Sequence, residues 1–285
     1  MNKFVEERNE NFFSVRYEID RVLYSKRSPF QKVEVVQTKG HGRMLLNDDL
    51  VMVSERDEFV YHDMITHPAL LTHPDPRRVL IIGGGDGGTA REVLRHTEVE
   101  QCDMVEIDGL VVEACREFLP VTAEALSTPA PRFSLHIDDG VKFIHETKNT
   151  YDVVIVDSTD PIGPATPLFG RDFYHDVFKH LADDGIVVSQ GESPYYNAKT
   201  QHAMAQILAE FFPIVRYLNF TNLTYPGGLW SFSFASKKWH PIRDFSEKRI
   251  REANLKFRYY NADIHRAAFA LPSFQLDNIG AFLKE

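Results

Sequence analysis

The chain has 285 residues, of which 43% are hydrophobic and 26% are charged, a composition typical of globular rather than disordered proteins. Its formal net charge of -9 at pH 7 argues against a nucleic-acid partner, because phosphates are usually met by clustered Lys and Arg. The N-terminal sequence MNKFVEERNENFFSV lacks the long apolar run of a signal peptide, and no stretch is apolar enough to span a membrane. We therefore expect a cytoplasmic protein with no membrane association.

The first part of the chain is predicted to be rich in β-strands. Short segments of β-forming residues are separated by turn residues such as Ser28-Pro29 and Lys39-Gly40. A helix is expected next, over Glu55–Thr72. The sequence thus predicts a small N-terminal β domain over residues 1–65. Its expected strands are Arg16–Tyr24, Lys32–Thr38, Gly42–Leu46 and Leu50–Ser54.

From Arg78 onward, predicted strands and helices alternate. Val79–Ile82 is a continuous apolar run, as expected of a strand buried on both faces. Repeated βα units specify a mostly parallel sheet with helices on both sides. We therefore predict an α/β fold, with a Rossmann-like, doubly wound catalytic domain over residues 66–285. Cys102 and Cys115 match no metal-ligand spacing and are interpreted as buried thiols.

A glycine-rich loop follows the first strand of this second domain. Gly83, Gly85 and Gly88 satisfy G-x-G-x-x-G between a strand and a helix, and Glu106 ends the next strand about 20 residues later. A carboxylate at that place can hold the hydroxyls of a ribose. The structural alternative is a turn that only packs the helix on the sheet. We interpret the pattern as a nucleoside-binding site.

Asp86 lies inside this loop and indicates which nucleoside ligand suits it. In a dinucleotide site the loop holds an anionic pyrophosphate, and a carboxylate about 4 Å away would oppose it by about 4 kcal/mol at an effective dielectric constant near 20. The loop therefore favours a cationic ligand. S-adenosylmethionine has two cationic groups, but its carboxylate would still face Asp86. The decarboxylated form, which lacks that negative charge, fits best.

A second group of carboxylates follows other strands of the same predicted sheet. Asp138-Asp139 and Asp157-Ser158-Thr159-Asp160 both come directly after a strand. In an open α/β sheet, ligands bind at the carboxyl ends of the strands, so these acidic residues should converge. Each one alone is more simply explained as a helix cap or a turn residue. A divalent metal is the other alternative for the group, but we predict none.

Together these motifs resemble those of the polyamine aminopropyltransferases, most closely the spermidine synthases. The resemblance runs from about Tyr24 to Pro272. The stretch DSTDPIGP, combined with GGGDGG, is much more specific than a glycine loop alone. The matching segments are 55–62, 83–87, 105–108, 138–140, 157–164, 224–228 and 258–261.

The resemblance implies an enzyme that transfers the aminopropyl group of decarboxylated S-adenosylmethionine to putrescine, giving spermidine and methylthioadenosine without a cofactor. It also implies a homodimer or homotetramer. Asp157 would accept the proton of the acceptor amine. The residues implied to bind the donor are Gln31, Asp86, Glu106, Asp139, Gly140 and Pro164. Those implied to bind the acceptor are Tyr61, His62, Asp86, Asp157, Ser158, Thr159, Asp160 and Tyr225.

Several alternatives stay open at this stage. The acceptor can be cadaverine, agmatine, spermidine or another amine instead of putrescine. An S-adenosylmethionine-dependent methyltransferase and a non-catalytic nucleoside-binding protein are compatible with the fold. The role of Asp108 is undecided, and Glu192 is either a partner for a distal ammonium or a solvated loop residue. The number of subunits is also undecided.

Overall fold

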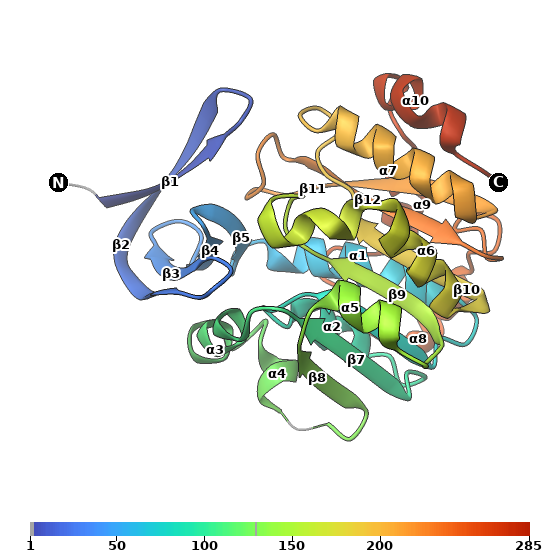
Figure 1. Cartoon of the computed structure of the whole chain (residues 1–285), viewed down its shortest axis with the longest axis horizontal. Coiled ribbons are helices and arrows are strands. Elements are labelled where there is room, and N and C mark those ends of the chain that lie inside the picture. Colours follow the sequence, from blue (N-terminus) through green and yellow to red (C-terminus); the bar gives the residue numbers. More distant parts are fainter. Residues whose placement is uncertain (1–2, 129) are drawn as a thin grey trace.

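The computed structural model describes residues 3–128 and 130–285 of the chain. Its first sheet is antiparallel, with the strand order β1-β2-β3-β4-β5, and lies to one side of the molecule (Figure 1). The four strands predicted in this region are confirmed. The strands are β1 (Lys3–Asn9), β2 (Phe13–Arg27), β3 (Lys32–Thr38), β4 (Arg43–Asn47) and β5 (Leu50–Ser54).

Strand β1 was not expected from the sequence. Its residues, KFVEERN, are largely polar and most are at least partly exposed, so they lack the alternation that marks a half-buried strand. The strand forms because β2 pairs with it in a continuous antiparallel register, from Lys3 opposite Ile19 to Asn9 opposite Phe13. This pairing makes a long hairpin (Figure 1).

The second sheet has the order β11-β12-β10-β9-β6-β7-β8. The run from β10 to β8 is parallel, and β12 and β11 join it antiparallel, which confirms the predicted mostly parallel, Rossmann-like sheet. The strands are β6 (Arg78–Gly83), β7 (Gln101–Glu106), β8 (Phe133–Ile137), β9 (Tyr151–Asp157), β10 (Leu181–Gln190), β11 (Ile214–Thr221) and β12 (Leu229–Ser236).

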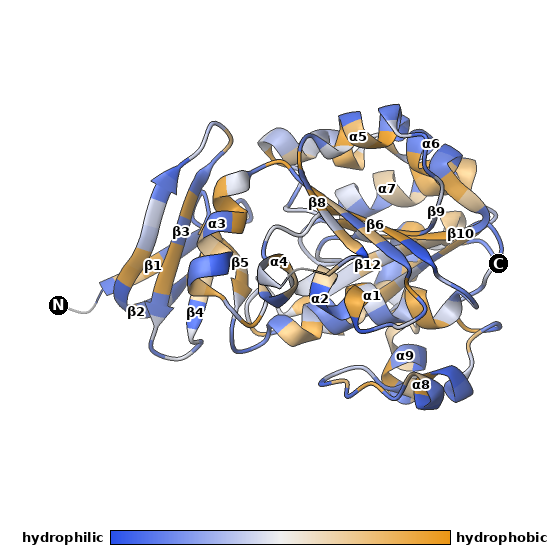
Figure 2. Ribbon diagram, turned by 90° about the horizontal axis from the view of Figure 1, so that it is seen from below, coloured by the Kyte–Doolittle hydropathy of each residue, from blue (hydrophilic) through white to orange (hydrophobic). Residues whose placement is uncertain are grey.

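Both faces of this sheet are covered by helices, and its strands are the apolar centre of the molecule (Figure 2). Successive residues of β6 belong to different hydrophobic clusters: Val79 and Ile81 lie in one, Leu80 and Ile82 in the other. The helices are α1 (Glu58–Thr72), α2 (Gly88–Leu94), α3 (Gly109–Phe118), α4 (Glu124–Ser127), α5 (Gly140–Glu146), η1 (Gly163–Phe169), α6 (Arg171–His180), α7 (Ala198–Phe211), α8 (Glu247–Ala253), α9 (Ala262–Ala268), α10 (Ser273–Ile279) and η2 (Gly280–Phe282).

Helix α1 connects the two sheets. Nearly all of its residues are buried, because it packs against β9, β10 and β11 as well as α2. The predicted division of the chain at residue 65 falls within this helix, and it stays a prediction. Within the described ranges, no helix is long and apolar enough to cross a membrane.

Candidate active site

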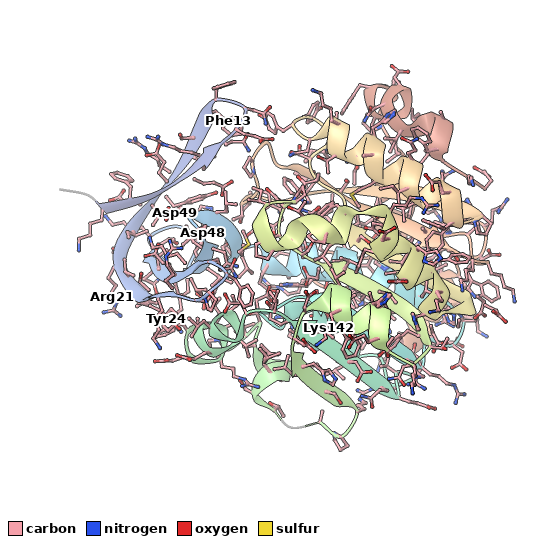
Figure 3. The ribbon with its side chains drawn as sticks, viewed as in Figure 1. Phe13, Arg21, Tyr24, Asp48, Asp49 and Lys142 are labelled. Atoms are coloured by element: carbon pink, nitrogen blue, oxygen red, sulfur yellow. The ribbon has the colours of Figure 1, made fainter. Side chains whose placement is uncertain are left out.

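A cavity of about 270 Å³ lies at the carboxyl edge of the parallel strands and reaches the N-terminal sheet. The turn that joins β4 and β5 contributes Asp48 to its wall (Figure 3). Every site residue predicted above lines this cavity, although the role of each stays a prediction. They are Gln31, Tyr61, His62, Asp86, Glu106, Asp139, Gly140, Asp157, Ser158, Thr159, Asp160, Pro164 and Tyr225.

The glycine loop lies against the end of β9. Gly83 and Gly84 have φ of 85° and 73°, a region that other residues rarely adopt. A Cβ atom at Gly83 would lie 2.1 Å from the carbonyl oxygen of Asp157, and the N–H of Gly84 donates to that oxygen at 2.8 Å. Glycine is therefore required for the loop to approach the strand that carries Asp157.

The predicted ribose partner, Glu106, is buried at the end of β7. Its carboxylate accepts a hydrogen bond from the N–H of Asp108 at 2.8 Å, and burial raises its pKa to about 7. Asp108 in turn accepts from Gln31 Nε2 at 3.0 Å and from Ser28 Oγ at 2.7 Å, and it also caps α3. Asp108 thus holds Gln31, a predicted donor ligand, rather than pointing at the donor itself.

Three other predicted donor residues follow β8 or β9 at the same edge of the sheet. Asp139 caps α5 by accepting from the N–H of Val141 at 2.8 Å. A Cβ atom at Gly140 would lie 2.4 Å from Ile82 Cγ2, so glycine lets α5 begin directly on the sheet. Pro164 lies in the short helix η1, which follows β9.

Asp86 is the outer member of a buried series of charged side chains that continues through His62, Glu58 and Arg91. His62 Nε2 lies 3.3 Å from Asp86 Oδ1, and His62 Nδ1 lies 2.7 Å from Glu58 Oε2. Burial alone would lower the pKa of His62, but Asp86 and Glu58 reverse this and hold it well above its usual value. Arg91 Nη2 lies 2.8 Å from the same oxygen of Glu58. The imidazole is therefore a charged link between two carboxylates.

Both ring nitrogens of His62 face these carboxylates, so the geometry supports a role for it in holding Asp86. The loop makes room for the ring, because a Cβ atom at Gly88 would lie 2.2 Å from His62 Cε1. Burial raises the pKa of Glu58, but His62 and Arg91 outweigh it and lower that pKa to about 2. Glu58 was not singled out from the sequence, although the i,i+4 spacing with His62 on one helix was a usable signal.

Asp157 lies between two hydroxyl groups. Tyr61 donates to its Oδ1 at 2.8 Å, and Thr89 donates to its Oδ2 at 2.6 Å. Burial and the nearby Asp86 raise the pKa of Asp157, whereas His62 and the two hydroxyls oppose the rise. The carboxylate is thus a stronger base than an ordinary aspartate while it stays hydrogen-bonded.

At the far end of the cavity, further acidic residues surround Asp160. Gln190 Nε2 donates to Glu192 Oε1 at 2.9 Å and to Asp160 Oδ1 at 3.3 Å. Burial raises the pKa of Asp160 to about 6 and, together with Asp160, that of Glu192 to about 8. A small cavity of about 40 Å³ at this end is also lined by Glu7 of β1, whose pKa burial raises to about 7. Glu192 is therefore buried rather than solvated.

Aromatic and hydroxyl side chains complete this part of the wall. Tyr225 donates to the carbonyl of Met52 at 2.8 Å, and its ring meets that of Tyr61 edge to face, with centroids 5.8 Å apart. The hydroxyl of Ser158 is buried and has no hydrogen-bond partner among the described residues. Tyr61 and Tyr225 thus enclose the space beside Asp157 with apolar ring surfaces.

A group of side chains with the spacing of metal ligands lies outside the cavity. Among the residues that the structure describes, Asp63, His67 and Glu92 form a group with metal-ligand spacing, and none of them lines the cavity. Glu92 is paired with Arg91 and Arg95, and Asp63 accepts three backbone N–H groups. The arginines already offset the charge of Glu92, and the backbone N–H groups already hydrogen-bond Asp63. This group therefore does not fit a metal ion.

Comparison with known sequences decides the family. The profile of the spermine/spermidine synthase domain matches residues 58–247, and that of the spermidine synthase tetramerisation domain matches residues 4–55. The chain belongs to the spermine/spermidine synthase family. The predicted resemblance and the predicted class of enzyme, an aminopropyltransferase, are both confirmed.

The similar proteins align with almost the whole length of this chain. Polyamine aminopropyltransferases of Alkaliphilus oremlandii and Clostridium beijerinckii are 47% and 44% identical to it, over 92% and 96% of both chains. The crystal structure of spermidine synthase from Thermotoga maritima has a TM-score of 0.94 at 37% identity, covering 99% of this chain and 95% of that one. A spermidine synthase in complex with the transition-state analogue AdoDATO has a TM-score of 0.95 at 37% identity, with 99% and 97% coverage.

Proposed function

We propose that this aminopropyltransferase is a spermidine synthase, which uses decarboxylated S-adenosylmethionine as donor and putrescine as acceptor. The observation that carries the proposal is the row of carboxylates along one cavity, from Glu106 past Asp86 and Asp157 to Asp160. The two substrates together bring several cationic groups and no anionic group, and the row offsets their mutual repulsion. The similar structure that holds AdoDATO supports the same reaction.

In this proposal the donor lies across the glycine loop and Glu106, which are in contact with each other. Glu106 binds the ribose hydroxyls, with Gln31, Asp139, Gly140 and Pro164 around the nucleoside. Asp86 then faces the ammonium of the aminopropyl group, and the buried chain through His62 fixes its orientation. A methionine carboxylate would lie against Asp86 instead, which disfavours S-adenosylmethionine as a donor and methyl transfer as the reaction.

The reaction is a direct displacement. The acceptor nitrogen attacks the propyl carbon bonded to sulfur and forms the new C–N bond. The C–S bond breaks, and its electron pair goes to sulfur, which leaves as the neutral thioether methylthioadenosine. The proton that the nitrogen loses passes to Asp157, whose raised pKa makes it a better base. Because the sulfonium is already an activated leaving group, the proposed reaction needs no cofactor.

The far end of the cavity favours a short diamine. Asp160 and Glu7 line this end and suit a distal ammonium, which Ser158, Thr159 and Tyr225 would help to place. Glu192 does not line the cavity, but it shares the amide of Gln190 with Asp160 and adds negative charge next to it. The space beyond Asp160 is only about 40 Å³. A primary ammonium suits this space better than the larger guanidinium of agmatine or the additional aminopropyl arm of spermidine.

The assembly and location of the enzyme belong to the same proposal. The match of residues 4–55 to a tetramerisation domain supports a homotetramer in which the N-terminal sheet forms the contacts. A cytoplasmic location agrees with the substrates, which are metabolites of the cell interior.

The experiment that tests the proposal is a turnover assay with decarboxylated S-adenosylmethionine and a panel of amines, in which methylthioadenosine and the amine product are both measured. We expect putrescine to give the highest kcat/KM. A higher value with cadaverine, agmatine or spermidine would retain the chemistry but overturn the proposed acceptor. Methyl transfer from S-adenosylmethionine would overturn the donor assignment.

The proposed base is tested by Asp157→Asn. The amide keeps the shape of the side chain but cannot take the proton, and general-base catalysis typically contributes about 10² to 10⁴-fold in rate. We expect kcat to fall within that range, whereas the binding of methylthioadenosine stays close to wild type. Wild-type turnover in this variant would exclude Asp157 as the base.

A further inference from the structure

Thr89, the second residue of α2, places its side chain beside the proposed base. It is fully buried, and its hydroxyl donates to Asp157 Oδ2 at 2.6 Å. Among the described residues this is the hydroxyl's one hydrogen-bond partner. No motif in the sequence distinguishes this threonine, so the contact is known from the fold alone.

The contact completes a clamp on the Asp157 carboxylate. Tyr61 of α1 holds Oδ1 from one side, and Thr89 of α2 holds Oδ2 from the other. The glycine loop runs close by, since a Cβ atom at Gly84 would lie 3.0 Å from Asp157 Oδ2. Threonine is β-branched and has few allowed rotamers, and the hydrogen bond to Asp157 selects the one in which the hydroxyl points at Oδ2. Rotation of the carboxylate would break both hydrogen bonds.

We propose that Thr89 is a positioning residue, which fixes the plane of the Asp157 carboxylate so that it meets the acceptor nitrogen. This rests on the proposed role of Asp157 as the base. Each carboxylate oxygen accepts more than one hydrogen bond, so Asp157 keeps a free acceptor site for the substrate proton while both hydroxyls are bound.

The same contact favours the ionised form of Asp157, against burial and the charge of Asp86. The titratable groups around it are Tyr61 and His62 of α1, Asp86 of the glycine loop, Glu106 of β7 and Tyr225 after β11. Burial and Asp86 raise the pKa of Asp157, and the hydrogen bond from Thr89 lowers it. Without that hydrogen bond the pKa rises further, so the active, ionised base forms only at higher pH.

The experiment compares Thr89→Val, which replaces the hydroxyl by a methyl group, with Thr89→Ser, which keeps the hydroxyl. We expect the valine variant to lose about tenfold in kcat at pH 7 and to move the acid limb of its kcat/KM profile up by about one pH unit, the usual range for a hydrogen bond to a charged group. The KM for the donor should not change. The serine variant should recover most of the activity and the wild-type profile.

The matched control is Thr66→Val on α1, because Thr66 is equally buried and its hydroxyl has no partner among the described residues. It should behave as the wild type. Thermal unfolding shows whether each variant is folded, and Thr89→Ala supplies a second hydroxyl-free variant if valine disturbs the fold.

Two results would overturn the proposal: a wild-type kcat and pH profile in a folded, hydroxyl-free variant, or equal losses in the serine and valine variants. Either result with an inactive Asp157→Asn variant would reject only the role of Thr89. An active Asp157→Asn variant would instead reject the base assignment on which it rests.

Discussion

Glu192 provides a test of the proposed acceptor end of the cavity, because it is joined to the lining residue Asp160 through Gln190. Its side chain is fully buried, and Oε2 has no hydrogen-bond partner among the described residues. Burial and the neighbouring Asp160 raise the pKa of Glu192 to about 8. At pH 6, without acceptor, its carboxyl group is therefore protonated. A bound ammonium stabilises the carboxylate, so the binding of putrescine should release a proton.

The magnitude follows from the pKa. Removing a proton at pH 6 from a group with a pKa of about 8 costs about 2.7 kcal/mol, because each unit corresponds to about 1.36 kcal/mol. For a single site with this pKa, the dissociation constant of putrescine should fall about 50-fold from pH 6 to pH 8. In Glu192→Gln most of this dependence should disappear. A smaller dependence should remain from Glu7 and Asp160, whose pKa values are about 7 and about 6.

The assay is calorimetry of putrescine binding to the enzyme saturated with methylthioadenosine, in buffers that differ in their heats of ionisation. The buffer dependence of the heat counts the protons released. Glu146→Gln, at an exposed residue of α5, is the control and should retain the wild-type release. A wild-type affinity independent of pH between 6 and 8, with no proton release, would refute the reasoning.

Two further predictions concern the chain behind Asp86. In Gly88→Ala the added Cβ atom meets the His62 ring, so we expect the donor KM to rise at least tenfold in a steady-state assay; an unchanged KM would show that the ring moves freely. In Glu58→Gln, His62 loses one of its two carboxylate partners, and nuclear magnetic resonance of the imidazole should report a lower pKa. An unchanged imidazole pKa would show that Asp86 alone keeps the ring charged.

The sequence predicted well which residues meet at the carboxyl edge of the sheet, because its signals are local. A strand, a glycine turn and a helix follow one another within residues 79–96, and the carboxylates at 106, 139 and 157 each end a strand or follow one directly. The rule that parallel strands present their carboxyl ends at one edge then brings these residues together. The family resemblance supplied what this rule does not, such as Gln31 in the turn between β2 and β3.

Other parts of the site depend on contacts between distant segments. Glu7 lies in a polar strand whose sequence gives no signal of burial. Only the packing of β1 beside β5 brings it to Val51, where its carboxylate accepts a hydrogen bond from the backbone N–H at 2.9 Å. Thr89 lies in an ordinary helix start, 68 residues from Asp157 along the chain. Neither residue type is unusual at its position, so no pattern in the sequence distinguishes them.

The hydrogen bond from Gly84 to the backbone of Asp157 has a mechanical consequence. In the proposed reaction Asp157 offers its side chain to the acceptor, while its carbonyl accepts from the loop expected to hold the donor, so the two substrate positions would share one backbone junction. The distance between nucleophile and electrophile would then depend on main-chain geometry as well as on the orientation of the Asp157 carboxylate. Replacing the Asp157 side chain leaves this backbone hydrogen bond in place. A substitution there can therefore change the chemistry without changing the spacing of the two substrates.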